Sequence, residues 1–347
     1  MSPSIAQRHV FICITPLQVL IAQRIIVDLI AQPAQIIGLY LPYADTAKHR
    51  HYFAKLQAVC DQAAFVVLKN QTWQQRFVTL HQLKHTLKRL NLWQQPVERV
   101  YLASVDVLFL QYVIAKINFY QLYTFDDGTA NIFPNSSYHQ PLPKSRAMQA
   151  FKKLLGVRYA DVGAVLAASQ AHYTIFPHEK NVIANTIPIA LYKDWLPMHD
   201  HARQEPSANQ AEQTVKRLLL GQGLDAFIGA AAYRELVQTM VTRFAIDAFV
   251  PHPRERLDFG ALLPVLATDN IIEDYVMAEL RQYPNQVIEI YTFMSTAVFT
   301  LKDLPRTRIT LVYNRALWQQ FAEAYQFLVS RGFRLVDIDA PNREGSA

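Results

Sequence analysis

The chain has 347 residues, and its 51% hydrophobic and 18% charged content predicts about two folded domains and excludes a disordered chain. Its 10 glycines are too few for a collagen-like or glycine-linker protein and argue against a glycine-rich dinucleotide-binding design. The net charge of +6 favours anionic partners such as nucleotide phosphates, acidic glycans or an anionic membrane face, whereas the lack of any lysine- and arginine-rich run argues against a nucleic-acid-binding protein.

Apolar and amphipathic segments alternate through the first part of the chain. Residues 9–15 predict a strand, and Thr15-Pro16-Leu17-Gln18 predicts a helix start, because Thr15 can cap the helix and Gln18 can complete a capping box. Further strands are predicted at 35–41, 64–68, 97–102 and 122–125, and helices near 51–59 and at 74–90 and 106–117. This alternation predicts βαβ units and a doubly wound parallel sheet.

A second alternation follows a polar stretch. Residues 197–213 are rich in charged and small polar side chains and include two prolines, which predicts an interdomain linker. Beyond it we predict strands at 215–220, 246–250, 287–292 and 308–312, and helices at 230–244, around 270–280, from 295 and at 317–330. The sequence therefore predicts an α/β protein with two Rossmann-like domains, residues 1–196 and 214–347, and a cleft between them.

The cysteines and the apolar segments bear on the protein's location. Cys13 and Cys60 lie in apolar segments and are too few for a disulfide framework or a four-cysteine zinc site, which predicts buried thiols in a reducing compartment. The most apolar stretch, residues 9–31, is interrupted by Pro16, Gln18 and Arg24, so we predict neither a transmembrane helix nor a signal peptide. We expect a cytoplasmic protein, either free or at the inner face of the cytoplasmic membrane.

Three groups of polar residues follow predicted strands, where open α/β sheets bind ligands. The first is Asp126-Asp127-Gly128, in which a carboxylate could act as general base towards a hydroxyl. Taken alone, this motif favours the alternative of an ordinary Asp-Gly turn. It is not the Asp-x-Asp pattern of metal-dependent transferases, so no metal is predicted.

The second group is Pro251-His252-Pro253-Arg254-Glu255. The prolines fix the backbone around His252, whose imidazole could bind or protonate a leaving phosphate beside Arg254. A solvated histidine in a polar loop is an equally good interpretation. The third is Ser295-Thr296, which opens a helix whose hydroxyls and free N–H groups can hold a phosphate, although an ordinary helix cap is commoner.

Two further features lie in the same part of the chain. Glu273-Asp274 could accept hydrogen bonds from ribose hydroxyls, although a solvated helix face is the simpler interpretation. Gly221-Gln222-Gly223 lacks the third glycine of a dinucleotide fingerprint and predicts a tight turn near the cleft. Asp225, just after that turn, is another candidate acid.

Four short motifs occur in a characteristic order: ITPLQ after the first strand, FDDGTAN near residue 126, PHPRE near 252 and FMSTAVF near 295. Together they resemble the bacterial lipooligosaccharide sialyltransferases of glycosyltransferase family 52, over about residues 9–300. The resemblance implies a GT-B-like fold with two parallel sheets facing a central cleft. It also implies an inverting, metal-independent transfer of sialic acid from CMP-sialic acid to a terminal galactose of a lipooligosaccharide-type glycan, in α-2,3 linkage.

The resemblance assigns roles to the candidate residues. His252 matches the family's histidine that faces the CMP phosphate, Ser295 and Thr296 match its phosphate-binding hydroxyls, and Glu273 matches an acid that holds the ribose. The acceptor base stays open among Asp126, Asp127 and Asp225. The other residues expected at the CMP-sugar site are Thr15, Gln18, Gly128, Gly221, Gln222, Pro253 and Arg254.

The resemblance also implies partners. We expect a homodimer in peripheral contact with a membrane, with CMP-sialic acid as donor substrate, no cofactor, no metal and no nucleic acid. Two other functions fit the residues: a transferase that uses another CMP-sugar, such as CMP-Kdo, or builds a capsule polymer, and a non-catalytic nucleotide- or glycan-binding protein. Donor screening separates the first from a sialyltransferase, and the retained acids argue against the second.

Overall fold

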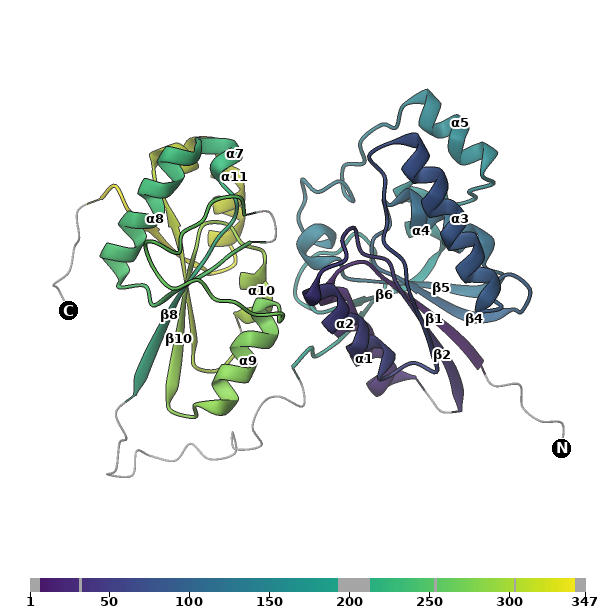
Figure 1. Cartoon of the computed structure of the whole chain (residues 1–347), viewed down its shortest axis with the longest axis horizontal. Coiled ribbons are helices and arrows are strands. Elements are labelled where there is room, and N and C mark those ends of the chain that lie inside the picture. The colour runs from purple at the N-terminus through teal and green to yellow at the C-terminus, as the bar shows by residue number, and fades with distance from the viewer. Residues whose placement is uncertain (1–6, 31–32, 193–212, 253–254, 303, 341–347) are drawn as a thin grey trace. The chain divides into compact units, whose positions relative to one another are not determined.

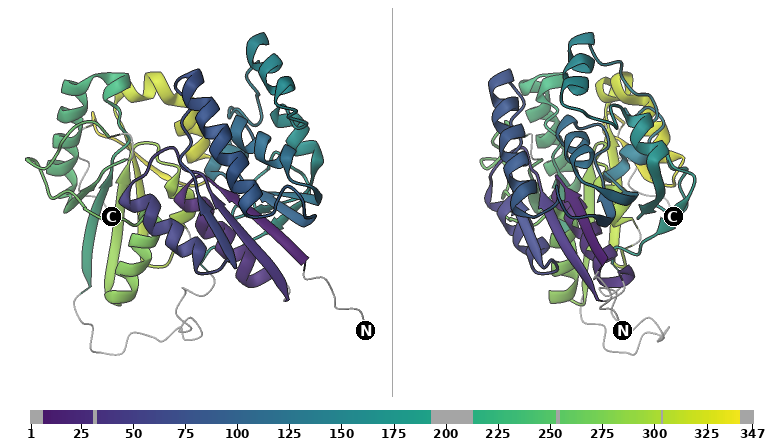
Figure 2. Two further views of the ribbon diagram at one scale, coloured as in Figure 1. Left: turned by 45° about the vertical axis from the view of Figure 1, so that its right-hand side comes forward. Right: turned by 90° about the vertical axis from the view of Figure 1, so that its right-hand side faces the viewer.

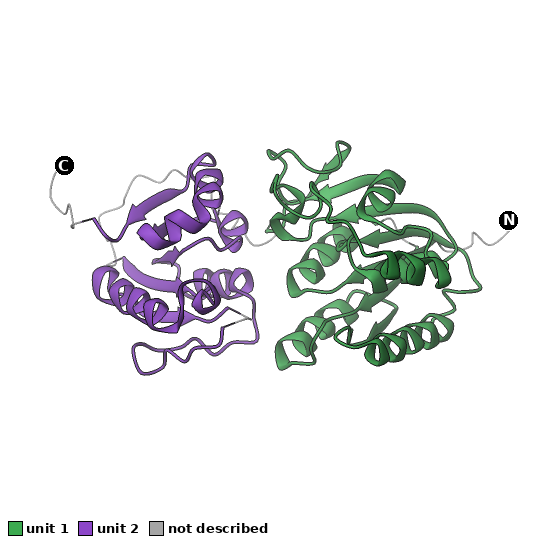
Figure 3. Ribbon diagram, turned by 90° about the horizontal axis from the view of Figure 1, so that it is seen from above, with its two compact units in different colours: residues 1–193 green, residues 194–347 purple. Residues whose placement is uncertain are grey.

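The computed structural model describes residues 7–340 except for 31–32, 193–212, 253–254 and 303. The chain forms two compact units, Met1–Lys193 and Asp194–Ala347 (Figure 3). The predicted linker, residues 197–213, lies outside the described residues except for residue 213. Among the described helices, none has both the length and the apolar character needed to cross a bilayer.

The first unit is built on a seven-stranded sheet in the order β3-β2-β1-β4-β5-β6-β7 (Figure 1). Every neighbouring pair is parallel. The first six strands follow the order 3-2-1-4-5-6 of doubly wound nucleotide-binding folds, whose ligand crevice lies where the strand order reverses, here between β1 and β4. The strands are β1 (Gln7–Cys13), β2 (Ala34–Tyr40), β3 (Gln62–Phe65), β4 (Val97–Leu102), β5 (Phe119–Phe125), β6 (Ser169–Thr174) and β7 (Thr186–Pro188).

Helices cover both faces of this sheet (Figures 1 and 2). On one face lie α1 (Pro16–Leu29) and α2 (Ala47–Gln57), and on the other α3 (Trp73–Arg89) and α4 (Leu108–Lys116). The capping box predicted for α1 is confirmed, with Thr15 as N-cap and Pro16 in the first turn. The remaining helical elements are η1 (Gly128–Asn131), α5 (Arg146–Leu154) and α6 (Val162–Ala168).

The second unit has a five-stranded sheet in the order β12-β11-β10-β8-β9, again with every neighbouring pair parallel. Counted within the unit this is the order 2-1-3-4-5, whose reversal lies between β8 and β10. The strands are β8 (Thr214–Leu220), β9 (Ala248–Val250), β10 (Gln286–Thr292), β11 (Thr307–Tyr313) and β12 (Arg334–Asp337). The helices are α7 (Asp225–Ile228), α8 (Ala230–Phe244), α9 (Ile272–Gln282), α10 (Ala297–Leu301) and α11 (Arg315–Val329).

The predicted α/β class with two Rossmann-like units is confirmed, but several elements were not predicted: β6, β7, β12 and α6. The strand β6 (SQAHYT) was not predicted from its sequence because two of its buried residues, His172 and Thr174, are polar. Their hydrogen bonds to Asp126 offset the cost of burying them. The helix predicted to open at Ser295 begins at Ala297 instead.

Candidate active site

Asp127, just past β5, is the centre of a hydrogen-bond network at the carboxyl edge of the first sheet. Its Oδ1 accepts from Gln18 Nε2 at 2.5 Å, and its Oδ2 accepts from Ser104 Oγ at 2.9 Å and Tyr138 Oη at 2.7 Å. Gln18 follows β1 and Ser104 follows β4, the two strands between which the strand order reverses. The half-buried Asp127 carboxylate therefore lies beside the position where folds of this kind bind ligands.

Gln18 connects the start of α1 to this carboxylate. Its Oε1 accepts from the backbone N–H groups of Ile14 at 2.6 Å and Thr15 at 3.3 Å, and its Nε2 donates to Asp127 and to Ser104 Oγ. The side chain is fully buried, so its amide has a single orientation that satisfies all four contacts. Thr15 caps the helix by accepting from Gln18 N at 3.4 Å.

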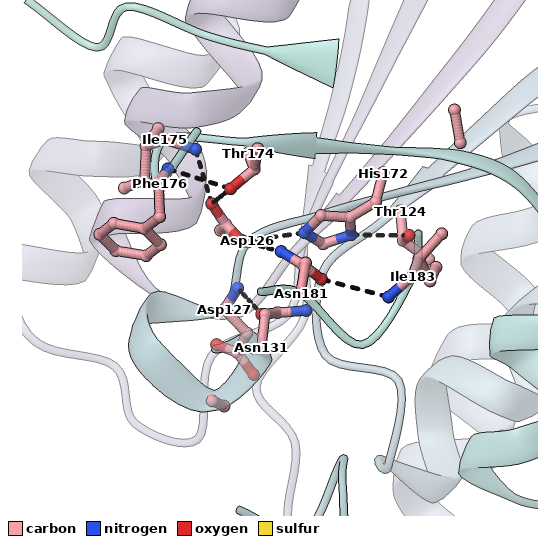
Figure 4. Close-up of polar contacts among 12 residues, drawn as sticks. Thr124, Asp126, Asp127, Asn131, His172, Thr174, Ile175, Phe176, Asn181 and Ile183 are labelled. Atoms are coloured by element: carbon pink, nitrogen blue, oxygen red, sulfur yellow. Dashed lines mark hydrogen bonds and ion pairs between the residues drawn. The ribbon is translucent and has the colours of Figure 1, made fainter. Parts of the chain in front are cut away.

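Asp126 has a different environment from its neighbour (Figure 4). It is 0% exposed, its Oδ1 is 2.8 Å from His172 Nε2, and its Oδ2 accepts from Thr174 Oγ1 at 2.9 Å and Ile175 N at 2.6 Å. Asn181 Nδ2 donates to Oδ1 at 3.5 Å. These contacts join the end of β5 to β6 and to the loop after it.

Counting acceptor sites separates the two carboxylates. A carboxylate offers about four lone-pair positions to hydrogen-bond donors. Asp126 meets four donors and is closed to solvent, whereas Asp127 meets three side-chain donors and is partly open. This favours Asp127 over Asp126 as a group that can meet a substrate hydroxyl.

Tyr138 reaches Asp127 from the segment after η1. Burial, reinforced by the charge of Asp127, raises the pKa of the Tyr138 hydroxyl well above its usual value, so it keeps its proton and donates. The predicted Gly128 has a φ of +58°, which lets the chain turn from Asp127 into η1.

In the second unit, the turn Gly221–Gly223 follows β8. A Cβ at Gly221 would lie 2.5 Å from Phe249 Cζ and 2.9 Å from Glu255 Oε2, so no larger residue fits without displacement. Gly223, with a φ of +60°, donates its N–H to Glu255 Oε2 at 3.1 Å. Tyr233 Oη donates to the same oxygen at 2.9 Å and accepts from Gln222 N at 3.2 Å. Glu255 thus fixes this turn.

The Gln222 side chain spans the reversal of this sheet, because its Oε1 accepts from the backbone N–H of Met294, just past β10. Ser295 and Thr296 come next and precede α10. Thr296 occupies the N-cap position without a side-chain cap bond, and within the described residues neither hydroxyl is engaged in a hydrogen bond. Both hydroxyls are therefore available to a ligand at this edge of the sheet.

The structure places the other predicted residues separately. His252 lies two residues past β9, and its carbonyl accepts from Glu255 N at 2.8 Å, while Pro253 and Arg254 lie outside the described residues. Half-buried Asp225 begins the four-residue α7. Glu273 is not on a solvated helix face: it is 5% exposed and accepts from Thr300 Oγ1 in α10 at 2.9 Å.

Three residues of these networks were not predicted, Ser104, Tyr138 and Tyr233, and a fourth, Glu255, was part of a predicted motif but was given no role. Ser104 follows β4, so the rule that sites lie past strand ends could have found it. No sequence motif near Tyr138 or Tyr233 indicates that these tyrosines belong to the site. Among the residues that the structure describes, no three His, Cys, Asp or Glu side chains converge as metal ligands would.

Solved structures share this fold. A UDP-GlcNAc 2-epimerase from Neisseria meningitidis bound to UDP-GlcNAc superposes with a TM-score of 0.53 at 10% identity, over 95% of this chain and 88% of that one. LpCGTa in complex with UDP gives a TM-score of 0.52 at 12% identity, over 97% and 87% of the two chains. The two sheets thus define a GT-B-like protein, as predicted.

The sequence matches the model of glycosyltransferase family 52 over residues 34–315. It is 31% identical to the CMP-N-acetylneuraminate:beta-galactoside alpha-2,3-sialyltransferase of Pasteurella multocida, over 85% of this chain and 87% of that protein. It is 27% identical to the N-acetyllactosaminide alpha-2,3-sialyltransferase of Haemophilus influenzae, over 88% and 91% of the two chains. The chain therefore belongs to glycosyltransferase family 52 and is a glycosyltransferase, which confirms the family expected from the four motifs.

Proposed function

We propose that the protein transfers sialic acid from CMP-sialic acid to a terminal galactose of a lipooligosaccharide-type glycan, forming an α-2,3 linkage with inversion and without a metal ion. The observation that carries this proposal is the similarity to three relatives named α-2,3-sialyltransferases, which covers 85%, 88% and 95% of this chain. The first of these is named for CMP-N-acetylneuraminate and a β-galactoside, which supports the choice of donor and acceptor.

Asp127 is the base in this proposal. Gln18, Ser104 and Tyr138 hold its carboxylate in one orientation and leave one acceptor position for the incoming galactose hydroxyl. As that hydroxyl attacks C2 of the sialic acid, its proton passes to Asp127 and the bond from C2 to the phosphate oxygen breaks. Asp225 remains the alternative base, and Asp225→Asn tests it directly.

The departing CMP gains negative charge on its phosphate as that bond breaks. In this proposal the free hydroxyls of Ser295 and Thr296 donate to the phosphate, and His252 supplies a proton or a positive charge. Stabilising the phosphate with fixed donors does the work that a metal ion does for a diphosphate leaving group. Glu273 and the Oε1 of Glu255 would accept from hydroxyl or amino groups of the CMP. That Oε1 is buried without a partner among the described residues.

The testing experiment measures CMP release from CMP-sialic acid by the purified protein, with and without lactose, in EDTA. We expect release that rises with lactose, together with a sialylated product whose anomeric configuration is opposite to that of the donor. Release without dependence on lactose would contradict the acceptor, and loss of activity in EDTA that returns with a divalent cation would contradict metal independence. Turnover only with CMP-Kdo, or tight CMP binding without turnover, would replace the sialyltransferase by one of the two alternative functions.

We also propose that the enzyme acts as a cytoplasmic homodimer in peripheral contact with the inner membrane face, as the family resemblance implies. Light scattering during size-exclusion chromatography tests the dimer. Fractionation of cells at low and high salt tests the location, because peripheral attachment through charge is weakened by salt.

A further inference from the structure

A basic groove with a volume of 730 Å³ opens on the first unit. It lies among the loop after β2, the start of α2, the end of β3 with the loop after it, and α3. Its charged or aromatic lining residues include Tyr43, Arg50, Phe65, Lys69, His85 and Arg89.

The groove carries more positive than negative charge. His81, His85 and Arg89 are spaced four residues apart on α3 and so lie along one row of the helix, and Lys69 approaches from the loop after β3. Within the described part of the chain, none of these four side chains pairs with a carboxylate. The one acid of the lining, Asp45, is occupied by Arg50 through two hydrogen bonds of 2.7 and 2.5 Å.

Two aromatic rings give the groove a shape that a solvated helix face lacks. The Arg50 guanidinium lies 4.1 Å from the centroid of the Phe65 ring, which fixes both groups in the wall. Tyr43, 47% exposed, lines the groove from the loop after β2. Partial burial, followed by the charges of Asp127 and Asp106, raises the pKa of its hydroxyl. A concave site with aromatic walls and a few converging polar groups is typical of a small-ligand site.

The strand order sets the distance from this groove to Asp127. The Asp127 carboxylate contacts Gln18, which follows β1, and Ser104, which follows β4. From β1, the strand β2 is one inter-strand spacing away and β3 is one further. At ~4.8 Å per spacing the ends of β2 and β3 lie roughly 5–10 Å beyond β1. A group bound there would belong to a part of the acceptor beyond the galactose whose hydroxyl meets Asp127.

We propose that this groove binds a phosphate group that the acceptor glycan carries on a sugar near its terminal galactose. The proposal rests on the proposed function, since it assigns the acceptor to Asp127. Lys69 and Arg89 supply the charge, and His81 and His85 supply further donors, for charge-assisted hydrogen bonds to phosphate oxygens. A phosphate of a bilayer surface is a poorer match, because a concave wall with aromatic rings cannot lie flat on lipid headgroups.

The test compares two fluorescently labelled, galactose-terminated oligosaccharides that differ only in a phosphomonoester on the sugar next to the terminal galactose. Binding to the full chain is measured by fluorescence anisotropy. We expect the phosphorylated glycan to bind about tenfold more tightly, which corresponds to about 1.4 kcal/mol. The double variant Lys69→Ala/Arg89→Ala should lose this preference and keep its kcat/KM for lactose.

The matched control is Lys84→Ala/Lys88→Ala, which removes the same amount of charge, here from α3 outside the groove, where both lysines lie over the Trp93 ring. It should keep the preference for phosphate. Equal binding of the two glycans by the wild type, or equal loss of preference in both double variants, would overturn the proposal. So would a dependence on Lys69 and Arg89 that is seen only with vesicles of anionic phospholipid.

The outcome also separates this proposal from the function on which it rests. A phosphate preference that disappears in Lys69→Ala/Arg89→Ala, without transfer of sialic acid to either glycan, would leave the groove in place and remove the sialyltransferase. Transfer of sialic acid to both glycans at equal kcat/KM, with equal affinity, would support the sialyltransferase and rule out the phosphate site in the groove.

Discussion

Replacing each carboxylate of the Asp126-Asp127 pair by its amide should separate a residue that supports the fold from one that performs the reaction. In Asp126→Asn the new amide has to face His172, because the N–H of Ile175 on the other side can only donate. His172 must then accept at Nε2 and donate from Nδ1 to Thr124, 2.9 Å away. The variant can fold, but its short hydrogen bonds lose their charge.

The magnitude follows from those bonds. A hydrogen bond to a charged group contributes about 1.5–3 kcal/mol, against about 0.5–1.5 kcal/mol between neutral groups. Losing ~1 kcal/mol at each of three short bonds lowers the unfolding free energy by ~3 kcal/mol, or the Tm by about 6–12 °C for a unit of this size. In Asp127→Asn the hydroxyls of Ser104 and Tyr138 can turn and accept from the amide, so the expected cost is only ~1 kcal/mol.

Activity should show the opposite order. Loss of a general base typically costs 10²–10⁴-fold, so Asp127→Asn should lower kcat by about that factor while its binding of CMP-sialic acid stays near the wild-type value. Asp126→Asn, assayed well below its Tm, should stay within about tenfold of the wild type. The measurements are thermal unfolding, initial rates and donor binding on both variants. An Asp127→Asn enzyme with most of its kcat, or an Asp126→Asn enzyme that is inactive at an unchanged Tm, would refute this reasoning.

Three further predictions concern both units. Gly221→Ala should destabilise the second unit by about 1–3 kcal/mol through overpacking against Phe249, whereas Gly163→Ala, whose Cβ would only touch Asp161 Oδ1 at 3.4 Å, should not; urea unfolding distinguishes them. Glu255→Gln keeps an oxygen for Gly223 and Tyr233 but places an amide at the unpartnered position, so KM for CMP-sialic acid should rise at a nearly constant Tm; a lower Tm with unchanged KM would make Glu255 purely structural. Burial, with a smaller contribution from the charge of Arg99, lowers the pKa of His9 from 6.5 to about 4. Between pH 6.5 and pH 4 the unfolded chain therefore binds more protons than the folded chain, so the free energy of unfolding falls as the pH falls. About 2 kcal/mol should be lost between pH 7 and pH 5, and His9→Gln should lose less over the same range.

The sequence predicted the elements whose patterns are local. The start of α1 followed from Thr15, Pro16 and Gln18, which lie within four residues of one another, and the apolar strands β1, β4 and β8 followed from their composition. β6 was hidden because its stability depends on Asp126, more than forty positions earlier in the chain, as the His172 contact shows. Short-range periodicity contains no information on such a partner.

The same reason limited the prediction of the site. The motif around residue 126 could not show which aspartate is closed to solvent, because the donors to Asp127 come from Gln18, Ser104 and Tyr138. Those contacts exist only once β1, β4 and β5 have paired. The interpretation of Glu273 as a solvated acid was wrong for a related reason, since α10 covers it and supplies Thr300.

The network around Asp127 also has a consequence for the order of events during synthesis. Every donor to its carboxylate lies between Gln18 and Tyr138, so the geometry of the proposed base is encoded before any residue of the second unit has been translated. Domains generally fold as units, from the N-terminal side first. A ribosome-bound chain could therefore hold a finished acceptor-side carboxylate while it still lacks Ser295 and Thr296, so a prematurely terminated product would be folded in part and unable to consume its donor.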